Sequence, residues 1–321
     1  MSDQVVDFLK SNYSFSSSLN VTFVSNIHSL SSSLVYKIVS CNQIFALKSY
    51  EISMYPSLSW SHQVLEKIRR DGFHLFPEVV RSKKKNTIER HQNCCWDLSG
   101  WMNGSVPEPT LSNLSKMIVS LAEFHLKVGK VYSSHGEIPG WKKRLNEYRK
   151  LSILDFSHDS HFFLSNLKLS SLFKWLKNEL DWLSCIPLPF ANNQICWGDA
   201  RRENSLIENG EICGFIDYGS FRIDAREVDV CRMISSFAED DFLMWEKSLK
   251  IYSSIVPVNF LACRILDLLG TAISLFRWIK WFKSPGKIKN QESGIKRINE
   301  LLQRIEKWKE HGSLKSMLFF D

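Results

Sequence analysis

The sequence lacks the cysteine spacing of a zinc site. Its 321 residues include eight cysteines, and none of them forms a C-x-x-C pair, so we exclude a zinc-finger module. Scattered cysteines of this kind are typical of free thiols in a reducing compartment. The first seven residues lack a basic region followed by an apolar core, and we therefore expect no signal peptide.

Long apolar runs without charge are also absent. The most apolar stretch, Phe260 to Phe282, contains two arginines, one lysine and one aspartate, which predicts a core helix and not a membrane span. No internal repeat is present. Hydrophobic residues make up 44% of the chain and charged residues 23%, which excludes a disordered protein. We therefore expect a soluble, cytoplasmic protein that has no membrane partner.

Length and charge set looser bounds. A chain of 321 residues suits two domains or one two-lobed domain, and it can bury a sizeable core. The formal net charge is +7, from 41 basic and 34 acidic residues. This excess suits an anionic partner, although an ordinary solvated surface gives the same number.

The N-terminal part of the chain has a strand-like pattern. Three short β-rich runs are separated by serine, asparagine and glutamine: Val21–Val24, Leu34–Val39 and Ile44–Lys48. The tripeptide Cys41–Gln43 is a tight connection between the second and third runs. These features predict an antiparallel meander.

A helix and a second pair of strands are predicted next. Apolar residues share one helical face over Ser59–Arg70, and Asp71–Gly72 ends the pattern. Strands are expected near Glu78–Ser82 and Thr87–His91, on either side of the polar turn Lys83–Asn86. Hairpin tips are commonly charged and solvated, so we expect no nucleic-acid partner at this lysine run.

The character of the chain changes after Gly104. Apolar residues at helical spacing predict helices over Leu111–His125, Trp141–Leu151, Ser170–Leu183, Asp240–Ser253, Asn259–Lys283 and Gln291–Lys309. One β-island interrupts them, between Gln194 and Gly219. The sequence therefore predicts an α+β protein with a small β-rich lobe over residues 1–103 and a larger, mostly helical lobe over residues 104–321.

The β-island contains a hairpin with oxygen-bearing side chains at its open end. Asn209-Gly210 between two apolar runs is a strong hairpin signal, because both turn positions favour positive φ. Asn204 precedes the first strand and Asp217 follows the second. Paired strands lie about 4.8 Å apart, so both side chains can reach one ion. Hard oxygen ligands of this kind suit Mg²⁺.

Asp199 precedes Asn204 by five residues, on the loop that leads into the hairpin. An Asp-x₄-Asn segment, followed by a hairpin that ends in Asp-aromatic-Gly, matches the catalytic and metal-binding loops of kinases. The alternative interpretation is a polar hairpin on a helical domain, with Asp199 in a role like that of a helix cap.

These residues resemble the aminoglycoside phosphotransferase and choline-kinase-like family of small-molecule kinases, which have a protein-kinase-like two-lobed fold. Cys196-Trp-Gly-Asp-Ala-Arg-Arg-Glu-Asn is similar to that family's His-Gly-Asp-x₄-Asn loop, and Ile216-Asp-Tyr-Gly is similar to its Ile-Asp-Phe/Trp-Gly. The segment Phe221–Val230 resembles the one that follows, with a structural aspartate before a helix.

The resemblance also extends upstream. Ser29–Ile38 is similar to the loop that covers the phosphates, and Phe45–Lys48 resembles the strand that carries the ATP lysine. Trp96–Gly104 resembles the hinge between the lobes, and Leu121–His125 resembles a Leu-x₂-Leu-His helix. His125 itself, on an apolar helix face, is more simply explained as a hydrogen-bonded core residue.

The resemblance implies a role for each matching residue. Asp199 would accept or orient the proton of the acceptor hydroxyl. Asn204 and Asp217 would hold Mg²⁺, and Lys48 would meet the α- and β-phosphates of ATP. Other ATP contacts are implied at Ser31, Ser32 and Ser33 of the phosphate loop and at the hinge backbone near Ser99 to Trp101.

Three positions depart from the family pattern. Trp197 replaces the histidine of the catalytic loop. The helix acid that should pair with Lys48 is missing, because the alignment places Ser61 there, beside His62, and Glu66 lies one turn further along. Arg201 and Arg202 lie inside the catalytic loop, where they could neutralise a transferred phosphate or simply be solvated.

The leading hypothesis is an ATP- and Mg²⁺-dependent phosphotransferase that acts on a hydroxyl of a small molecule. The first alternative is a catalytically silent nucleotide-binding protein with a regulatory role, and the second is a helical interaction protein with no nucleotide site. Residues 237–321 contain fourteen basic and ten acidic residues. A basic acceptor lobe favours a neutral or anionic acceptor over a polycationic aminoglycoside.

Overall fold

The computed structural model describes residues 2–15, 19–24, 34–129, 132–152, 167–183, 185–186, 190–284 and 291–312. The chain forms two compact units. Unit 1 comprises Met1–Pro107 and Glu203–Arg222, and unit 2 comprises Glu108–Arg202 and Ile223–Asp321. The lobe boundary that the sequence places after residue 103 stays a prediction.

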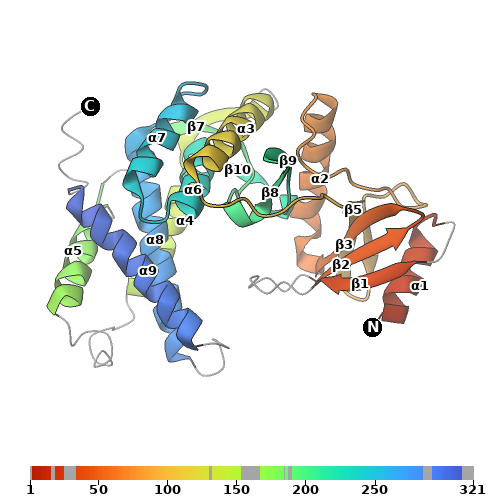
Figure 1. The fold of residues 1–321 in the computed structure, drawn as a ribbon, viewed down its shortest axis with the longest axis horizontal. Coiled ribbons are helices and arrows are strands. Elements are labelled where there is room, and N and C mark those ends of the chain that lie inside the picture. Colours follow the sequence, from red (N-terminus) through yellow and green to blue (C-terminus); the bar gives the residue numbers. More distant parts are fainter. Residues whose placement is uncertain are drawn as a thin grey trace. The chain divides into compact units, whose positions relative to one another are not determined.

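Unit 1 contains a five-stranded antiparallel sheet with the order β1-β2-β3-β5-β4 (Figure 1). Its strands are β1 (Asn20–Val24), β2 (Leu34–Ser40), β3 (Gln43–Glu51), β4 (Ile88–His91) and β5 (Cys94–Gly100). Cys41 and Asn42 join β2 to β3 with φ angles of 46° and 64°, the left-handed conformation that a tight hairpin favours. The predicted meander of the first three strands is confirmed.

The second hairpin of the sheet differs from the expected one. Gln92 and Asn93, with φ angles of 49° and 59°, join β4 to β5. The prediction of a strand at Glu78–Ser82 is wrong, because this segment forms only an isolated bridge, between Val79 and Ser99. Its end is drawn into a turn, in which Ser82 N–H donates to the Asn86 carbonyl oxygen at 2.8 Å.

Different helices cover the two faces of the sheet, because side chains alternate along each strand. On the first face, α1 (Ser2–Asn12) and the strands share a buried cluster of Val5, Phe8, Leu9, Tyr13, Tyr36, Ile38, Leu47 and Leu98. α2 (Tyr55–Arg70) covers the second face, where Leu58 packs with Ile88 and Cys95. Lys48 and Asp97 lie on this second face, since each is the sequence neighbour of a first-face residue.

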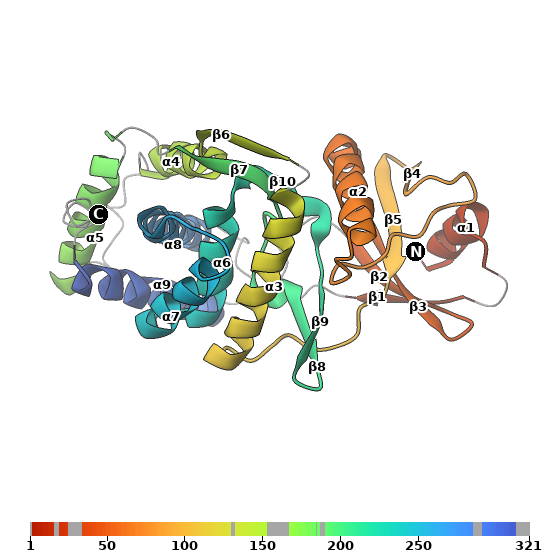
Figure 2. The same ribbon diagram turned by 90° about the horizontal axis from the view of Figure 1, so that it is seen from above.

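Residues 203–222 add a hairpin to unit 1, formed by β8 (Ser205–Glu208) and β9 (Glu211–Phe215) (Figure 2). Asn209 and Gly210 have φ angles of 51° and 79°, which confirms the predicted turn. The N–H groups of Ser105 and Ile207 each donate to the other's carbonyl oxygen at 2.9 Å. These backbone hydrogen bonds join the hairpin to the earlier part of unit 1.

Unit 2 is largely helical. Its described helices are α3 (Leu111–Gly129), α4 (Pro139–Ser152), α5 (Leu167–Leu183), α6 (Arg226–Ala238), α7 (Phe242–Ser253), α8 (Phe260–Lys283) and α9 (Gln291–Glu310). The six helices predicted from apolar spacing are confirmed, and α6 begins shortly after Asp224, as the resemblance implies. Within the unit, α9 packs along α8 (Figure 1).

A three-stranded sheet accompanies these helices. Its strands are β6 (Ser133–Glu137), β7 (Phe190–Cys196) and β10 (Arg222–Ala225), in the order β10-β7-β6. β6 and β10 lie outside the predicted β-island. The sequence of β6, Ser-Ser-His-Gly-Glu, has no strand pattern of its own, and its conformation follows from pairing with β7.

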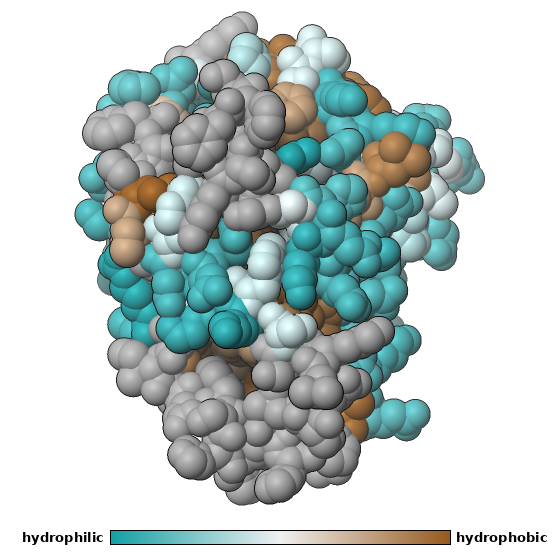
Figure 3. All heavy atoms as spheres, turned by 90° about the vertical axis from the view of Figure 1, so that its left-hand side faces the viewer, coloured by the Kyte–Doolittle hydropathy of each residue, from teal (hydrophilic) through white to brown (hydrophobic). Residues whose placement is uncertain are grey.

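No helix in the described part of the chain is both long and apolar enough to cross a membrane. In α8, the longest of them, Arg264 pairs with Glu246 at 2.8 Å and Asp267 pairs with Arg304 at 2.8 Å. Hydrophilic residues predominate among the described atoms on the face drawn in Figure 3.

Candidate active site

The lysine of β3 contacts the segment that follows β9. Lys48 Nζ lies 3.9 Å from Asp217 Oδ1 and 5.5 Å from the ring centroid of Tyr218. The side chain of Lys48 is 14% exposed and that of Asp217 is 42% exposed. The structure thus brings together two of the predicted site residues, and their ion pair is open to solvent on the aspartate side.

The two predicted metal ligands lie at the open end of the β8–β9 hairpin. Asn204 ends the short helix η2 (Arg202–Asn204) directly before β8, and its carbonyl oxygen accepts the Ile216 N–H at 2.8 Å. Asp217, directly after that residue, has φ 64° and ψ 58°. Left-handed backbone is uncommon for a residue other than glycine and concentrates at functional sites. One carboxylate and one amide oxygen form a donor set that suits a hard divalent cation.

A largely buried polar cluster lies beside Lys48 on the α2 side of the sheet. We call it the Asp97 cluster, and its members are Tyr50, His62, Asp97 and Tyr218. Asp97 is the cross-strand neighbour of Lys48 and is fully buried. Asp97 Oδ2 lies 3.1 Å from His62 Nε2 and accepts a hydrogen bond from the Tyr218 hydroxyl at 3.0 Å.

The tyrosines of this cluster stay protonated. Burial raises the pKa of Tyr50 and of Tyr218 well above the ordinary value of 10.0, and the nearby Asp97 carboxylate raises both further. The Tyr218 hydroxyl is therefore a permanent hydrogen-bond donor to Asp97 at physiological pH.

The structure agrees with the absence of a helix acid opposite Lys48. Ser61 is fully buried, and its hydroxyl donates back to the Ser57 carbonyl oxygen at 3.0 Å. Glu66 is the only acidic residue of α2, and its carboxylate pairs with Arg81. α2 therefore offers His62 to the sheet, and no carboxylate.

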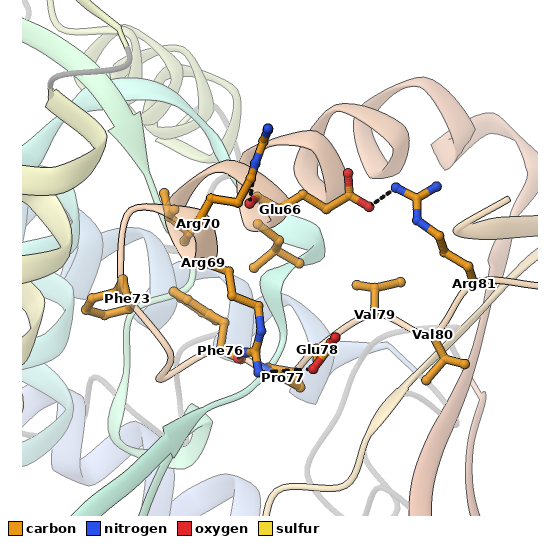
Figure 4. A pocket seen from close by; sticks show the side chains of 12 residues that line it. Glu66, Arg69, Arg70, Phe73, Phe76, Pro77, Glu78, Val79, Val80 and Arg81 are labelled. Carbon is orange, nitrogen blue, oxygen red and sulfur yellow. Dashed lines mark hydrogen bonds and ion pairs between the residues drawn. The ribbon is translucent and has the colours of Figure 1, made fainter. Parts of the chain in front are cut away.

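A hollow in unit 1 lies elsewhere, on the C-terminal part of α2. Its volume is about 740 Å³, and Figure 4 shows arginines and apolar residues around it. Arg81 pairs with Glu66, and Arg69 donates to Glu78 at 3.1 Å. None of the predicted site residues lines this hollow. Two of its three arginines are paired with acids, and the third, Arg70, donates to the Glu66 carbonyl oxygen at 3.2 Å, so we assign the hollow no part in the chemistry.

The hinge residues are part of the sheet. The Gly100 N–H donates to the Glu78 carbonyl oxygen at 2.9 Å, and the Trp101 N–H donates to the Ile44 carbonyl oxygen at 3.0 Å. Ser99 is buried, and the ammonium of Lys37 lies 4.8 Å from the Trp101 ring centroid. The adenine contact at Ser99 to Trp101 stays a prediction. The other predicted ATP contacts, Ser31, Ser32 and Ser33, lie outside the described residues.

Asp199 belongs to unit 2, where two arginines contact its carboxylate. Arg201 Nε lies 3.3 Å from Oδ2, and Arg232 of α6 pairs with Oδ1. The side chain of Asp199 is 13% exposed, and those of the arginines are 37% and 40% exposed. Two guanidinium groups that solvent can reach therefore contact this one carboxylate.

Asp229 anchors the loop that carries Asp199. Its carboxylate accepts hydrogen bonds from the backbone N–H groups of Trp197 at 2.6 Å and Gly198 at 2.8 Å. Gly198 has a φ of 82°, which a residue with a side chain rarely adopts. The ring of Trp197 is fully buried. Because the anchoring groups belong to the backbone, the loop does not require the family's histidine at position 197 for this support.

His125 is a hydrogen-bonded core residue, as expected. Its Nε2 lies 3.3 Å from Asp229 Oδ2, and its Nδ1 lies 2.7 Å from the Tyr252 hydroxyl. Cys196 brings its sulfur close to both His125 and Asp229, but this thiol donates to the Asp224 carbonyl oxygen at 3.3 Å. All three groups are buried and hydrogen-bonded, so we interpret them as structural support for the loop.

Sequence reasoning does not reveal two of these relationships. Asp97 is an acid inside a strand, where aspartate is disfavoured, and that local conflict is the signal that could have drawn attention to it. Arg232 is 33 residues from Asp199 in the chain, and no local pattern connects them.

The sequence model of the phosphotransferase enzyme family matches residues 24–253. No curated protein matches the chain. Among solved structures, the amicoumacin kinase in complex with AMP-PNP, Ca²⁺ and Ami has a TM-score of 0.67 at 11% identity, over 97% of this chain and 94% of that chain.

Two further structures are similar. A spectinomycin phosphotransferase in complex with ADP and spectinomycin has a TM-score of 0.62 at 12% identity, over 94% of this chain and 96% of that chain. An aminoglycoside phosphotransferase from Alicyclobacillus acidocaldarius has a TM-score of 0.63 at 14% identity, over 96% of this chain and 93% of that chain. These likenesses confirm the predicted α+β, protein-kinase-like fold.

Proposed function

Since this chain belongs to the phosphotransferase enzyme family of small-molecule kinases, we propose that it transfers the γ-phosphoryl group of ATP to a hydroxyl of a small molecule, with Mg²⁺. The observation that carries this proposal is the pairing of Lys48 with Asp217 at 3.9 Å. Phosphoryl transfer requires a cation that binds phosphate close to a carboxylate that binds metal, and Lys48 and Asp217 would fill these two roles.

The donor set at the hairpin fits Mg²⁺. Asn204 and Asp217 supply oxygen ligands, and Mg²⁺ prefers few protein ligands, with its remaining positions filled by water and substrate phosphates. The ion would neutralise charge on the β- and γ-phosphates. Lys48 would bind the α- and β-phosphates, and the backbone near Ser99 to Trp101 would contact the adenine.

Asp199 would accept the proton of the acceptor hydroxyl. In this step the hydroxyl oxygen bonds to the γ-phosphorus, the bond from that phosphorus to the β–γ bridging oxygen breaks, and ADP leaves with the electron pair. The loop's support from Asp229 suits this role, because a base must be held in position to be effective.

The charge near Asp199 supports a neutral or anionic acceptor. Arg201 and Arg232 both contact this aspartate, and guanidinium groups favour carboxylates and phosphates. A polycationic aminoglycoside would approach two positive charges at the proposed base. An anionic acceptor would instead compete for the arginines, and would thereby free the Asp199 carboxylate for the hydroxyl proton.

Binding and turnover measured together test the proposal. We expect Mg·ATP to bind and γ-phosphate to pass to an acceptor in a panel of neutral sugars, hydroxy acids and kanamycin-like compounds at low salt. Binding without turnover on any acceptor would favour the catalytically silent alternative, with a regulatory role. Absence of a thermal shift with Mg·ATP would favour a helical interaction protein. Efficient turnover of the aminoglycosides alone would overturn the acceptor class.

A further inference from the structure

Helix α2 lacks the acidic residue that would connect it to Lys48 in the proposed nucleotide site. In this family's pattern, an acidic residue of the helix pairs with the strand lysine and so couples the helix to the phosphates. Here α2 offers Ser61, whose hydroxyl is bonded to its own helix, and Glu66, which pairs with Arg81. Some other group must link α2 to Lys48 if the helix is to support this site.

The Asp97 cluster provides a continuous set of contacts between α2 and the site. His62 of α2 lies 3.1 Å from Asp97 Oδ2, and the Tyr218 hydroxyl donates to the same oxygen at 3.0 Å. The rings of His62 and Tyr218 are 5.6 Å apart in an edge-to-face arrangement. The face of the Tyr218 ring then lies 5.5 Å from Lys48 Nζ.

Tyr218 also adjoins Asp217, whose left-handed backbone requires support from its surroundings. The hydroxyl of Tyr218 is fixed to a strand, and its ring is packed against a helix. The conformation of Asp217 is therefore constrained by the residue that follows it. Position 48 is constrained too, because Asp97 is its cross-strand neighbour, with Cβ atoms about 5 Å apart in such pairs.

We propose that Asp97 and His62 are positioning residues that replace the missing helix acid, by holding Tyr218 and, through it, Asp217 and Lys48. This inference rests on the proposed nucleotide site. The acidic residue of this arrangement, Asp97, is on strand β5 instead of the helix, and the helix contributes His62. Asp97 has the burial that such a role requires, since solvent would otherwise compete for its hydrogen bonds.

The test is a double-mutant cycle on Mg·ATP affinity. Tyr218→Phe removes only the hydroxyl and keeps the ring beneath Lys48, whereas Asp97→Asn removes the charge and keeps the shape. Each should weaken Mg·ATP binding about tenfold, the effect of losing one charge-assisted hydrogen bond. Both substitutions act on the same hydrogen bond, between Tyr218 and Asp97. The double variant should therefore bind Mg·ATP no more weakly than the single variant with the lower affinity.

Glu89→Gln is the matched control. Glu89 is a buried acid on the adjacent strand β4, and its carboxylate accepts a hydrogen bond from Asn86 at 3.2 Å. This variant should lower the melting temperature without changing nucleotide affinity. Calorimetric titration of Mg·ATP and thermal denaturation, applied to all four variants and to the wild type, give both quantities.

The outcomes separate the two proposals. Wild-type protein that does not bind Mg·ATP would overturn the nucleotide site itself. Wild-type binding with unchanged affinity in Tyr218→Phe, or with losses that multiply to about a hundredfold in the double variant, would overturn the positioning role alone. If Asp97→Asn does not fold, the affinity of Tyr218→Phe decides the matter by itself.

Discussion

Asp229 accepts the backbone N–H of Trp197 at 2.6 Å. This bond joins the start of α6 to the loop that carries Asp199, and it uses a group that every residue except proline possesses. The replacement of the family's histidine by tryptophan therefore leaves the anchor intact. The indole ring at this position is fully buried in unit 2.

Asp199→Asn should lower kcat by about 10²–10⁴-fold, the usual effect of losing a positioned base. Mg·ATP affinity should stay nearly unchanged, because Asp199 is assigned to the acceptor hydroxyl and not to the nucleotide. Steady-state kinetics and calorimetry measure the two effects. Glu203→Gln, at an exposed acid in the same loop, is the control and should keep the wild-type rate. Near-wild-type turnover in Asp199→Asn would disprove the assignment.

Asp217→Ala should weaken ATP binding mainly when Mg²⁺ is present. Its carboxylate is the charged member of the proposed ligand pair, and one charge-assisted contact corresponds to about tenfold or more in affinity. ATP titrations with Mg²⁺ and with EDTA separate the metal effect from structural damage. Equal losses in both conditions would identify a structural aspartate. Glu211→Gln, at an exposed acid of the same hairpin, should change neither titration.

Arg304→Met should destabilise unit 2 by about 3–5 kcal/mol, because it leaves a buried carboxylate without its partner. Arg304 Nη2 lies 2.9 and 2.8 Å from the two oxygens of Asp267, and Trp308 Nε1 donates to the same carboxylate at 3.0 Å. Denaturant unfolding measures the loss. Arg297→Ala, which breaks an exposed ion pair with Glu300, should cost less than about 1 kcal/mol. Similar losses in the two variants would contradict this account.

Cys231 should make folding stability depend on alkaline pH. Burial raises the pKa of its thiol from the ordinary 9.0 to about 11. Above pH 9 the unfolded chain releases this proton while the folded chain retains it, so the stability from Cys231 is complete below pH 9 and is lost as pH rises towards 11. The difference in unfolding free energy between wild type and Cys231→Ala should shrink over this range by about 2 kcal/mol. A constant difference from pH 8 to pH 11 would rule this out.

The sequence predicts local relationships well and distant ones poorly. The Asn209-Gly210 turn determines the β8–β9 hairpin, so Asn204 and Asp217 could be placed together from spacing alone. The Asp97 cluster depends on the register of β3 against β5 and on how α2 packs over them, and neither is encoded within one short segment. The β4–β5 hairpin was not predicted from the sequence either, because Gln92-Asn93 is a weaker turn signal than the lysine-rich segment before it.

Helix α1 has a local sequence pattern that is too short to predict it. Val5, Phe8 and Leu9 have helical spacing, but three residues over so short a segment do not distinguish a helix from a loop. The helix forms because these side chains bury themselves against Tyr36, Leu47 and other residues of the sheet. Its stability therefore comes from tertiary packing, which single-sequence patterns do not report.

Unit 1 is assembled from two stretches of chain that are separated by residues 108–202. During translation, the strand that carries Lys48 leaves the ribosome well before Asp217 and Tyr218 are made. The hydrogen bond of Asp97 with the Tyr218 hydroxyl and the backbone hydrogen bonds of Ser105 with Ile207 can form only after residues 203–222 have been made. The segment up to residue 107 therefore cannot complete the proposed nucleotide site by itself, and the site forms only after residues 203–222 have been synthesised.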